Sequence, residues 1–217
     1  ILQQWGEFDP LSSTHNFRVG MHDALESSVL PPLIKVLSRR APNVGISSIK
    51  VDRSNLEREL ASGHIDIALD VSRSVKKPVN QHKIWNSGFC VVMRNSHPLQ
   101  HTLNQQNYLE SQHIIVSNRP LGMTMEDTFF QQQGLQRKTS IRCQNYFAAT
   151  KILSSSNQLL TITKSMAKQL LNEELCLVKV PFNLPRFGTS VYWHENTEQD
   201  SALAWLRSIL MDMEPHV

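Results

Sequence analysis

Long apolar runs are absent from this sequence of 217 residues. A membrane-spanning helix needs about 18 consecutive apolar residues, and no stretch approaches that length. The start also lacks the charged and apolar regions of a signal peptide. We therefore expect a cytoplasmic protein without a membrane partner. Because the chain begins at Ile1 rather than methionine, we also expect it to be a fragment, or a mature form, of a longer protein.

Cysteines and catalytic motifs are also scarce. The three cysteines, Cys90, Cys143 and Cys176, have no metal-binding spacing and are interpreted as reduced, mostly buried thiols. His97 and His101 are four residues apart, but Pro98 disfavours a helix there and no third ligand is near. The sequence has no Gly-x-Ser-x-Gly, glycine-rich phosphate loop, His-Glu-x-x-His or Cys-x-x-Cys. We therefore expect no metal, no cofactor and no catalysis.

No strong excess of one charge is present either. The formal net charge is +3, and adjacent basic residues occur only as isolated pairs. A surface that follows nucleic-acid phosphates needs a stripe of basic side chains. Direct DNA binding by this segment is therefore not expected.

What the sequence does contain is a regular alternation of strands and helices. Residues 17–21, 44–51 and 65–69 are predicted strands, and residues 30–40 and 56–61 are predicted helices between them. Strands separated by helices need crossover connections, so we expect parallel pairing with helices on both faces of the sheet. This predicts an α/β fold whose ligands bind at the carboxyl ends of the strands.

A second series of the same kind follows the polar stretch 72–78. Its predicted strands are 89–93, 113–116, 140–143, 159–162 and 175–180, and its predicted helices are 103–109, 125–133, 147–153 and 166–172. Gly134 follows one of these helices, as is typical of a helical carboxyl end.

The end of the sequence returns to the first series. Residues 190–193 predict a strand, and residues 197–213 predict an amphipathic helix capped by Thr197, with Asp200 in the reciprocal position. We therefore predict a linker remnant (1–16), a first lobe (17–79 plus 184–217) and an inserted second lobe (80–183). Two crossing strands would join the lobes and leave a hinged cleft between them.

This order of segments, with particular residues in them, resembles the effector-binding domain of LysR-type transcriptional regulators. The strings that carry the resemblance are Phe8-Asp9-Pro10, Leu30-Pro31-Pro32-Leu33, Arg40-Ala41-Pro42-Asn43, Asn95-Ser96-His97-Pro98-Leu99 and Trp193-His194-Glu195. Each string is common by itself, but their order and spacing extend over nearly the whole chain. The first and last strings are most similar to the NodD and LeuO branch.

The resemblance implies two Rossmann-like lobes joined by two crossing strands, as in type 2 periplasmic binding proteins. It implies a non-enzymatic domain that binds a small organic effector, anionic or aromatic, and that carries homodimer or tetramer contacts. In this family a helix-turn-helix domain and a linker helix precede the segment seen here. DNA would then be bound only through that missing N-terminal part.

Candidate ligand contacts follow from position at a strand end or helix start, where unpaired backbone N–H groups favour anions. In the first lobe they are His22 and Asp23 after the first strand, and Asp70 and Ser72 after the third. The alternative is a helix cap for Asp23 and a plain loop role for Asp70 and Ser72.

The second lobe offers a larger set of candidates at equivalent positions. They are Asn118, Thr124, Asn145, Tyr146, Thr163 and Lys164. Thr124 suits either a helix cap or a ligand hydroxyl, and Lys164 would add positive charge for a carboxylate. The resemblance points to these same loops as effector contacts.

Pro31 and Pro32 predict that the first helix either begins at Pro31 or kinks there, because proline lacks an amide donor. The resemblance implies that residues 33–40 and the edge strand 44–51 pack against the second lobe of a partner subunit. A solvent-facing helix is the alternative.

Two other functions share the expected architecture. A solute-binding protein of a transport system is the main alternative, and an upstream secretion signal would favour it. A two-lobed deaminase is the other, and it would need a catalytic constellation in the cleft.

Overall fold

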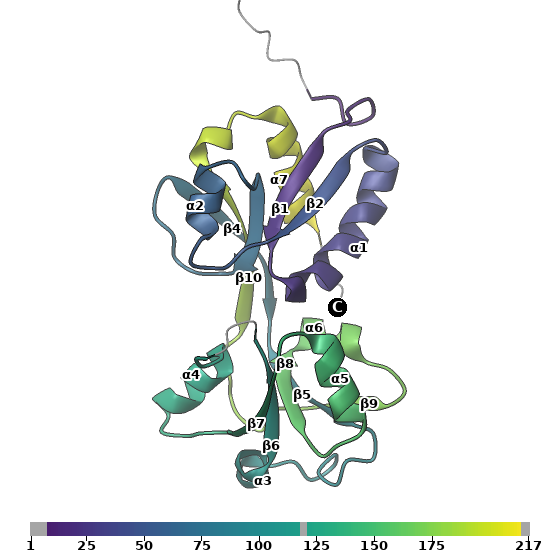
Figure 1. Cartoon of the computed structure of the whole chain (residues 1–217), viewed down its shortest axis with the longest axis vertical. Coiled ribbons are helices and arrows are strands. Elements are labelled where there is room, and N and C mark those ends of the chain that lie inside the picture. The colour runs from purple at the N-terminus through teal and green to yellow at the C-terminus, as the bar shows by residue number, and fades with distance from the viewer. Residues whose placement is uncertain (1–7, 118–120, 214–217) are drawn as a thin grey trace, which may run out of the picture. The chain divides into compact units, whose positions relative to one another are not determined.

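The computed structural model describes residues 8–117 and 121–213. Contacts within the chain divide it into two compact units (Figure 1). One contains the residues up to Asn86 and from Gly188 onward, and the other spans Ser87–Phe187. The chain therefore changes unit near Ser87 and again near Phe187, a few residues after the positions predicted for both crossings.

The first unit is a five-stranded sheet covered by helices. Its elements are β1 (Asn16–Met21), α1 (Asp23–Arg40), β2 (Gly45–Lys50), α2 (Leu56–Ala61), β3 (Ile67–Val71), β4 (Val79–Ser87), β10 (Phe187–His194), the short 3-10 helix η1 (Glu195–Thr197) and α7 (Ser201–Asp212). The strand order is β2-β1-β3-β10-β4. β1 pairs in parallel with β2 and β3, as predicted, whereas β10 is antiparallel to β3.

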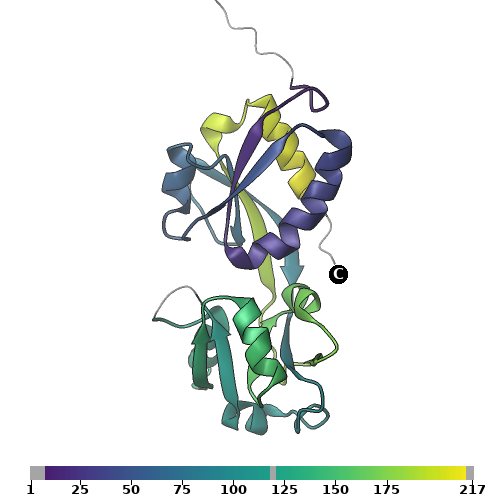
Figure 2. The same cartoon turned by 45° about the vertical axis from the view of Figure 1, so that its right-hand side comes forward.

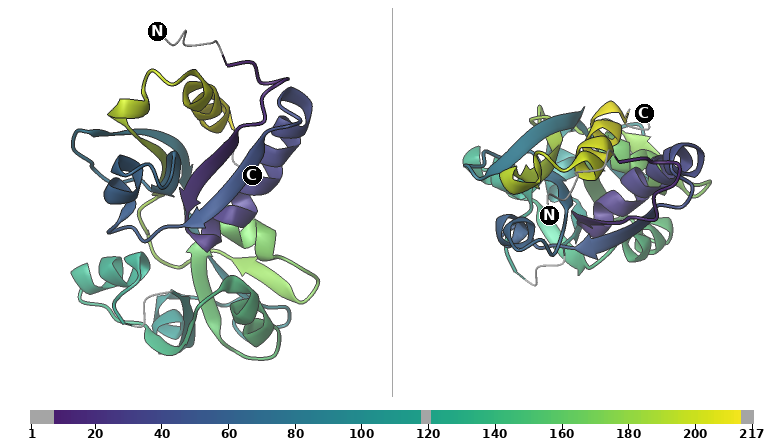
Figure 3. Two further views of the ribbon diagram at one scale, coloured as in Figure 1. Left: turned by 45° about the horizontal axis from the view of Figure 1, so that its top comes forward. Right: turned by 90° about the horizontal axis from the view of Figure 1, so that it is seen from above.

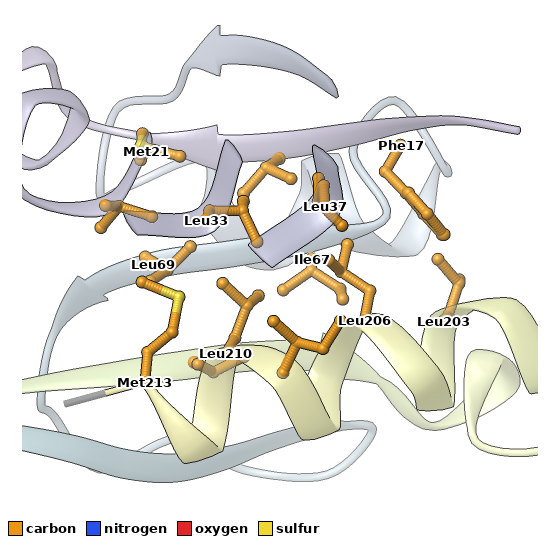
Figure 4. Packing of buried hydrophobic residues seen from close by; sticks show 14 of the residues in the cluster. Phe17, Met21, Leu33, Leu37, Ile67, Leu69, Leu203, Leu206, Leu210 and Met213 are labelled. Carbon is orange, nitrogen blue, oxygen red and sulfur yellow. The ribbon is translucent and has the colours of Figure 1, made fainter. Parts of the chain in front are cut away.

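Apolar side chains from both faces of this sheet hold the first unit together. Leu33 and Leu37 of α1 and Leu206 and Leu210 of α7 are buried in one cluster, with Phe17 of β1 (Figure 4). α2 packs its buried Leu56 and Leu60 into a separate cluster. Figure 3 shows α2 apart from α1 and α7. Helices therefore cover both faces of the sheet.

The second unit repeats this plan. Its elements are β5 (Phe89–Arg94), α3 (Gln105–Glu110), β6 (Gln112–Val116), α4 (Met125–Gln132), β7 (Lys138–Cys143), α5 (Tyr146–Ser154), β8 (Leu159–Thr163), α6 (Lys164–Leu170) and β9 (Leu175–Val178). The strand order is β7-β6-β8-β5-β9. β6 is parallel to β7 and β8, and β5 is antiparallel to β8 and β9. Figure 2 shows α5 covering one face of this sheet.

Three sequence predictions need correction. β4 was not predicted, because it is a polar edge strand in which only Val79 and Trp85 are buried. α1 does not begin at Pro31: it begins at Asp23 and contains both prolines. The last helix begins at Ser201, and its cap is Asp200, whose side chain accepts a bond from Leu203 N at 2.9 Å. Thr197 instead ends η1.

Expected parallel pairing is also wrong for β5 and β10. These two strands enter their sheets from the crossing segments, without a crossover helix before them. None of the helices in residues 8–117 and 121–213 has the length and apolar character needed to cross a membrane.

Candidate functional site

The strand ends of the first unit hold an ion pair at the predicted position. Asp70, near the end of β3, is buried, and both its carboxylate oxygens accept bonds from Arg53. The distances are 2.8 Å from Nε to Oδ2 and 3.0 Å from Nη2 to Oδ1. The hydrogen bonds to Asp70 raise the pKa of Arg53. Asp70 therefore orients Arg53, whose side chain is 48% exposed.

Two serines meet beside this ion pair. Ser72 Oγ lies 2.7 Å from Ser190 Oγ of β10, and Ser72 N donates to the carbonyl of Gly188 at 2.8 Å. A Cβ atom at Gly188 would lie 2.5 Å from Ser72 Oγ, so only glycine allows this approach. The hydroxyl of Tyr192 donates to the Val71 carbonyl at 2.6 Å, which fixes the turn after β3.

His22 and Asp23 occupy the junction between β1 and α1. His22 is the N-cap of α1, and its Nδ1 lies 3.3 Å from Ala24 N and 2.6 Å from Asp23 Oδ1. The imidazole and the carboxylate are 38% and 39% exposed. The cap role considered for Asp23 therefore belongs to His22, and Asp23 is the first helical residue.

Thr124 in the second unit is fully engaged in a helix cap. Its Oγ1 accepts from Asp127 N at 3.2 Å, and its backbone N donates to Asp127 Oδ2 at 3.2 Å, which closes a capping box at the start of α4. The Thr124 hydroxyl also donates to Asp127 Oδ2, at 2.9 Å. Arg137 Nη2 also donates to Thr124 Oγ1 at 3.2 Å. These bonds use the hydroxyl that was considered as a ligand contact.

Arg137 is a deeply buried charge of this unit, with a side chain 1% exposed. It donates to Asp127 Oδ1 from Nε at 2.8 Å and from Nη2 at 2.5 Å, and lies over the Phe130 ring. Burial would raise the pKa of Asp127, but the charge and hydrogen bonds of Arg137 hold it below its usual value. The pair therefore stays ionised and holds the start of α4.

The remaining candidates lie at the starts of α5 and α6. Asn145 is the N-cap of α5, with Oδ1 accepting from Ala148 N at 2.9 Å, and Tyr146 is the first residue of that helix. Thr163 ends β8 and makes no cap bond, although its hydroxyl lies 3.3 Å from Ser165 Oγ. Asn118 lies outside the described residues.

Lys164 differs from the other described candidates because its charged group forms no ion pair within the described residues. It is exposed at the first position of α6, and its ammonium has no hydrogen bond or ion pair within the described residues. The helix dipole disfavours a cation at that position, so Lys164 adds nothing evident to helix stability. A carboxylate could bind there without displacing an existing partner.

The structure divides the described candidates between the two units. Asp70 and Ser72 lie near His22, because β1 and β3 are adjacent and in register at Met21 and Leu69. Sequence reasoning missed Arg53 and Arg137. Arg53 follows the end of β2 and fits the strand-end rule, but Arg137 precedes β7 and its partners lie on α4, so sequence gave no signal for it.

No group of three or more metal-binding side chains forms in residues 8–117 and 121–213. His97 is buried, with Nδ1 accepting from Leu99 N at 3.0 Å, whereas His101 is exposed. The three cysteines are free thiols. Burial raises the pKa of Cys90 to about 11, which keeps this thiol protonated near neutral pH.

Comparison with known proteins gives a consistent result. A family model described as the LysR substrate binding domain matches residues 12–214. The transcriptional activator NagR of Ralstonia sp. is 25% identical over 208 residues, which cover 95% of this chain and 69% of NagR. Nodulation protein D 1 of Rhizobium tropici is 24% identical over 215 residues, 95% of this chain and 68% of that protein.

A solved structure agrees over almost the same length. The crystal structure of PA0477 from Pseudomonas aeruginosa, described as a probable transcriptional regulator, has a TM-score of 0.88 and 27% identity. The match covers 99% of this chain and 72% of PA0477. NagR and PA0477 are thus described as regulators of transcription, not as transport proteins or enzymes.

Proposed function

Because the chain belongs to the family of LysR substrate-binding domains, the effector-binding part of LysR-type transcriptional regulators, we propose that it senses a small organic carboxylate. The observation that carries this choice is Lys164, an exposed ammonium without a partner among the described residues, at the carboxyl end of β8. Ligands of α/β sheets bind at such strand ends. The first unit has strand-end groups of its own, namely the Ser72 and Ser190 hydroxyls and the oriented Arg53.

The effector acts by shifting an equilibrium between arrangements of the regulator. Only a ligand that binds one arrangement more tightly can do so, and by no more than its difference in affinity. The regulator assembles as a homodimer or tetramer, with α1 and β2 in the contact, and works in the cytoplasm. DNA is contacted by a helix-turn-helix segment outside residues 1–217.

Calorimetric titration with a panel of aromatic and aliphatic carboxylates tests the sensor function. We expect Lys164→Gln to weaken binding of the responding carboxylate about tenfold, the size typical of one charge-assisted hydrogen bond. Lys168→Gln is the matched control, because Lys168 is exposed on the same helix one turn later. If no carboxylate binds, or if both variants behave alike, the proposal is wrong.

Ser72→Ala tests the contribution of the first unit in the same assay. Its hydroxyl contacts only Ser190 Oγ among the described residues, so the substitution leaves the Arg53–Asp70 pair in place. Weaker effector binding without a change in thermal stability is expected. Unchanged affinity would show that Ser72 is not an effector contact.

A further inference from the structure

A pocket of about 460 Å³ lies inside the second unit, and none of the candidate contacts described above is among its described lining residues. Its walls come from α4, from β6 and the edge strand β7, from the segment joining α4 to β7, and from Gly122 and Met123 before α4. Figure 1 labels α4, β6 and β7. All the described lining residues fall between positions 115 and 142 and so belong to this unit. Thr124 is not among its walls.

The size and the lining of this pocket suit a compact organic ligand. Small-molecule sites have volumes of roughly 300–1,000 Å³, with apolar walls and a few polar groups. Ile115, Phe130 and Leu135 provide the apolar part here, and Gln131 and Thr139 provide amide and hydroxyl groups. A ligand with a single ring fits well within this volume.

The charged walls favour an anion. Asp127 and Arg137 line the pocket as an ion pair and neutralise each other. Arg142 lines it as a second guanidinium, and its Nη2 donates to the Gly122 carbonyl at 2.6 Å. Arg137 and Arg142 thus place guanidinium N–H groups in the pocket wall, and these are donors of the kind that bind a ligand carboxylate.

The same ion pair links the pocket to the start of α4. Arg137 and Asp127 form part of the pocket wall and also make the hydrogen bonds that fix Thr124. A ligand packed against them would therefore restrict the capping box. We propose that this pocket is a second small-molecule site, which takes compact monocarboxylates and whose occupancy stabilises the N-terminal turn of α4.

Benzoate and benzamide are the probes, because they have the same shape and differ in charge. Benzoate titrated to roughly 20 mM would reveal a dissociation constant in the millimolar range. We expect it to slow amide hydrogen exchange in the first turn of α4, and benzamide to bind about fivefold more weakly. Thr139→Trp should abolish the effect, because Thr139 is exposed on the edge strand β7 and its enlarged side chain would fill the pocket.

Lys138→Trp is the matched control, since Lys138 is the exposed neighbour of Thr139 but does not line the pocket. This control should retain the slowed exchange, and so should Lys164→Gln. Absence of slowed exchange in the unmodified chain would overturn the second site, leaving a pocket filled only with water. An effect that survives Thr139→Trp, or that is lost in Lys164→Gln, would also overturn it by assigning benzoate to the strand-end site.

Discussion

At the scale of single residues, the charge of Arg137 is buried and is paired with Asp127. A buried ion pair is costly to break, because the remaining charge stays buried without a partner. We expect Arg137→Met to lower the free energy of unfolding by about 3–5 kcal/mol, measured by urea denaturation. Adding Asp127→Asn to that variant should recover part of the loss, because the uncompensated carboxylate is then gone.

The control is a surface pair of the same chemistry. Arg58 lies 3.4 Å from Glu59, and its side chain is 72% exposed, so Arg58→Met should change stability by less than about 1 kcal/mol. Equal costs for Arg58→Met and Arg137→Met would contradict the role given to burial. Additive costs for Arg137→Met and Asp127→Asn would contradict their direct coupling.

His113 gives the fold a sensitivity to acid. Its Nε2 donates to the Tyr108 carbonyl at 2.7 Å, and its Nδ1 is buried without a partner among the described residues. Burial lowers the pKa of His113 to about 4, and the nearby charge of Arg137 acts in the same direction. The unfolded chain, with a histidine pKa of about 6.5, therefore binds this proton at a higher pH than the folded chain does.

Stability should consequently fall as the pH drops from about 6.5 to about 4, with a loss of roughly 3 kcal/mol from this group. Above about pH 6.5 this histidine is neutral in both the folded and the unfolded chain, so it makes no pH-dependent contribution to stability. His113→Gln keeps a donor for the Tyr108 carbonyl but cannot be protonated, so its urea midpoint should depend less on pH. The exposed His101→Gln is the control, and a pH dependence unchanged in His113→Gln would refute the assignment.

The strand-end rule that selected candidate residues also selects helix caps. His22, Thr124 and Asn145 all accept bonds from helix-start amides, because each follows a strand and precedes a helix. Sequence could locate these positions but could not separate a cap from a ligand contact. A cap differs from a ligand contact in whether its side chain still has an unused hydrogen-bonding group. That depends on tertiary partners such as Arg137.

At the scale of elements, strong apolar patterns predicted position well and polar segments did not. α2 was predicted with the bounds it has, and β6 and β8 to within one residue at each end. β4 was not predicted because its outward-facing residues are polar. The first two turns of α1 were not predicted because Glu26, Ser27 and Ser28 have weak helical patterning. Whether two strands pair in parallel or antiparallel depends on which strands are neighbours in the sheet. The residue pattern within one strand does not show which neighbours it has.

At the scale of the whole molecule, the two units have separate cores. Each buried apolar cluster draws its members from one unit only, and the clusters of the second unit lie wholly between residues 87 and 187. That unit is also one continuous stretch of chain with its own five-stranded sheet. The insertion therefore has what an independent domain needs.

We expect a fragment of residues 87–187 to fold by itself and to unfold cooperatively in urea, with a free energy of about 5 kcal/mol or more. A shorter fragment ending at residue 158 is the control, because it lacks β8, the strand between β6 and β5 that joins the two halves of the sheet. The short fragment should show no cooperative transition by circular dichroism. If the long fragment also lacks one, the first unit must supply stability that the second unit's own core does not.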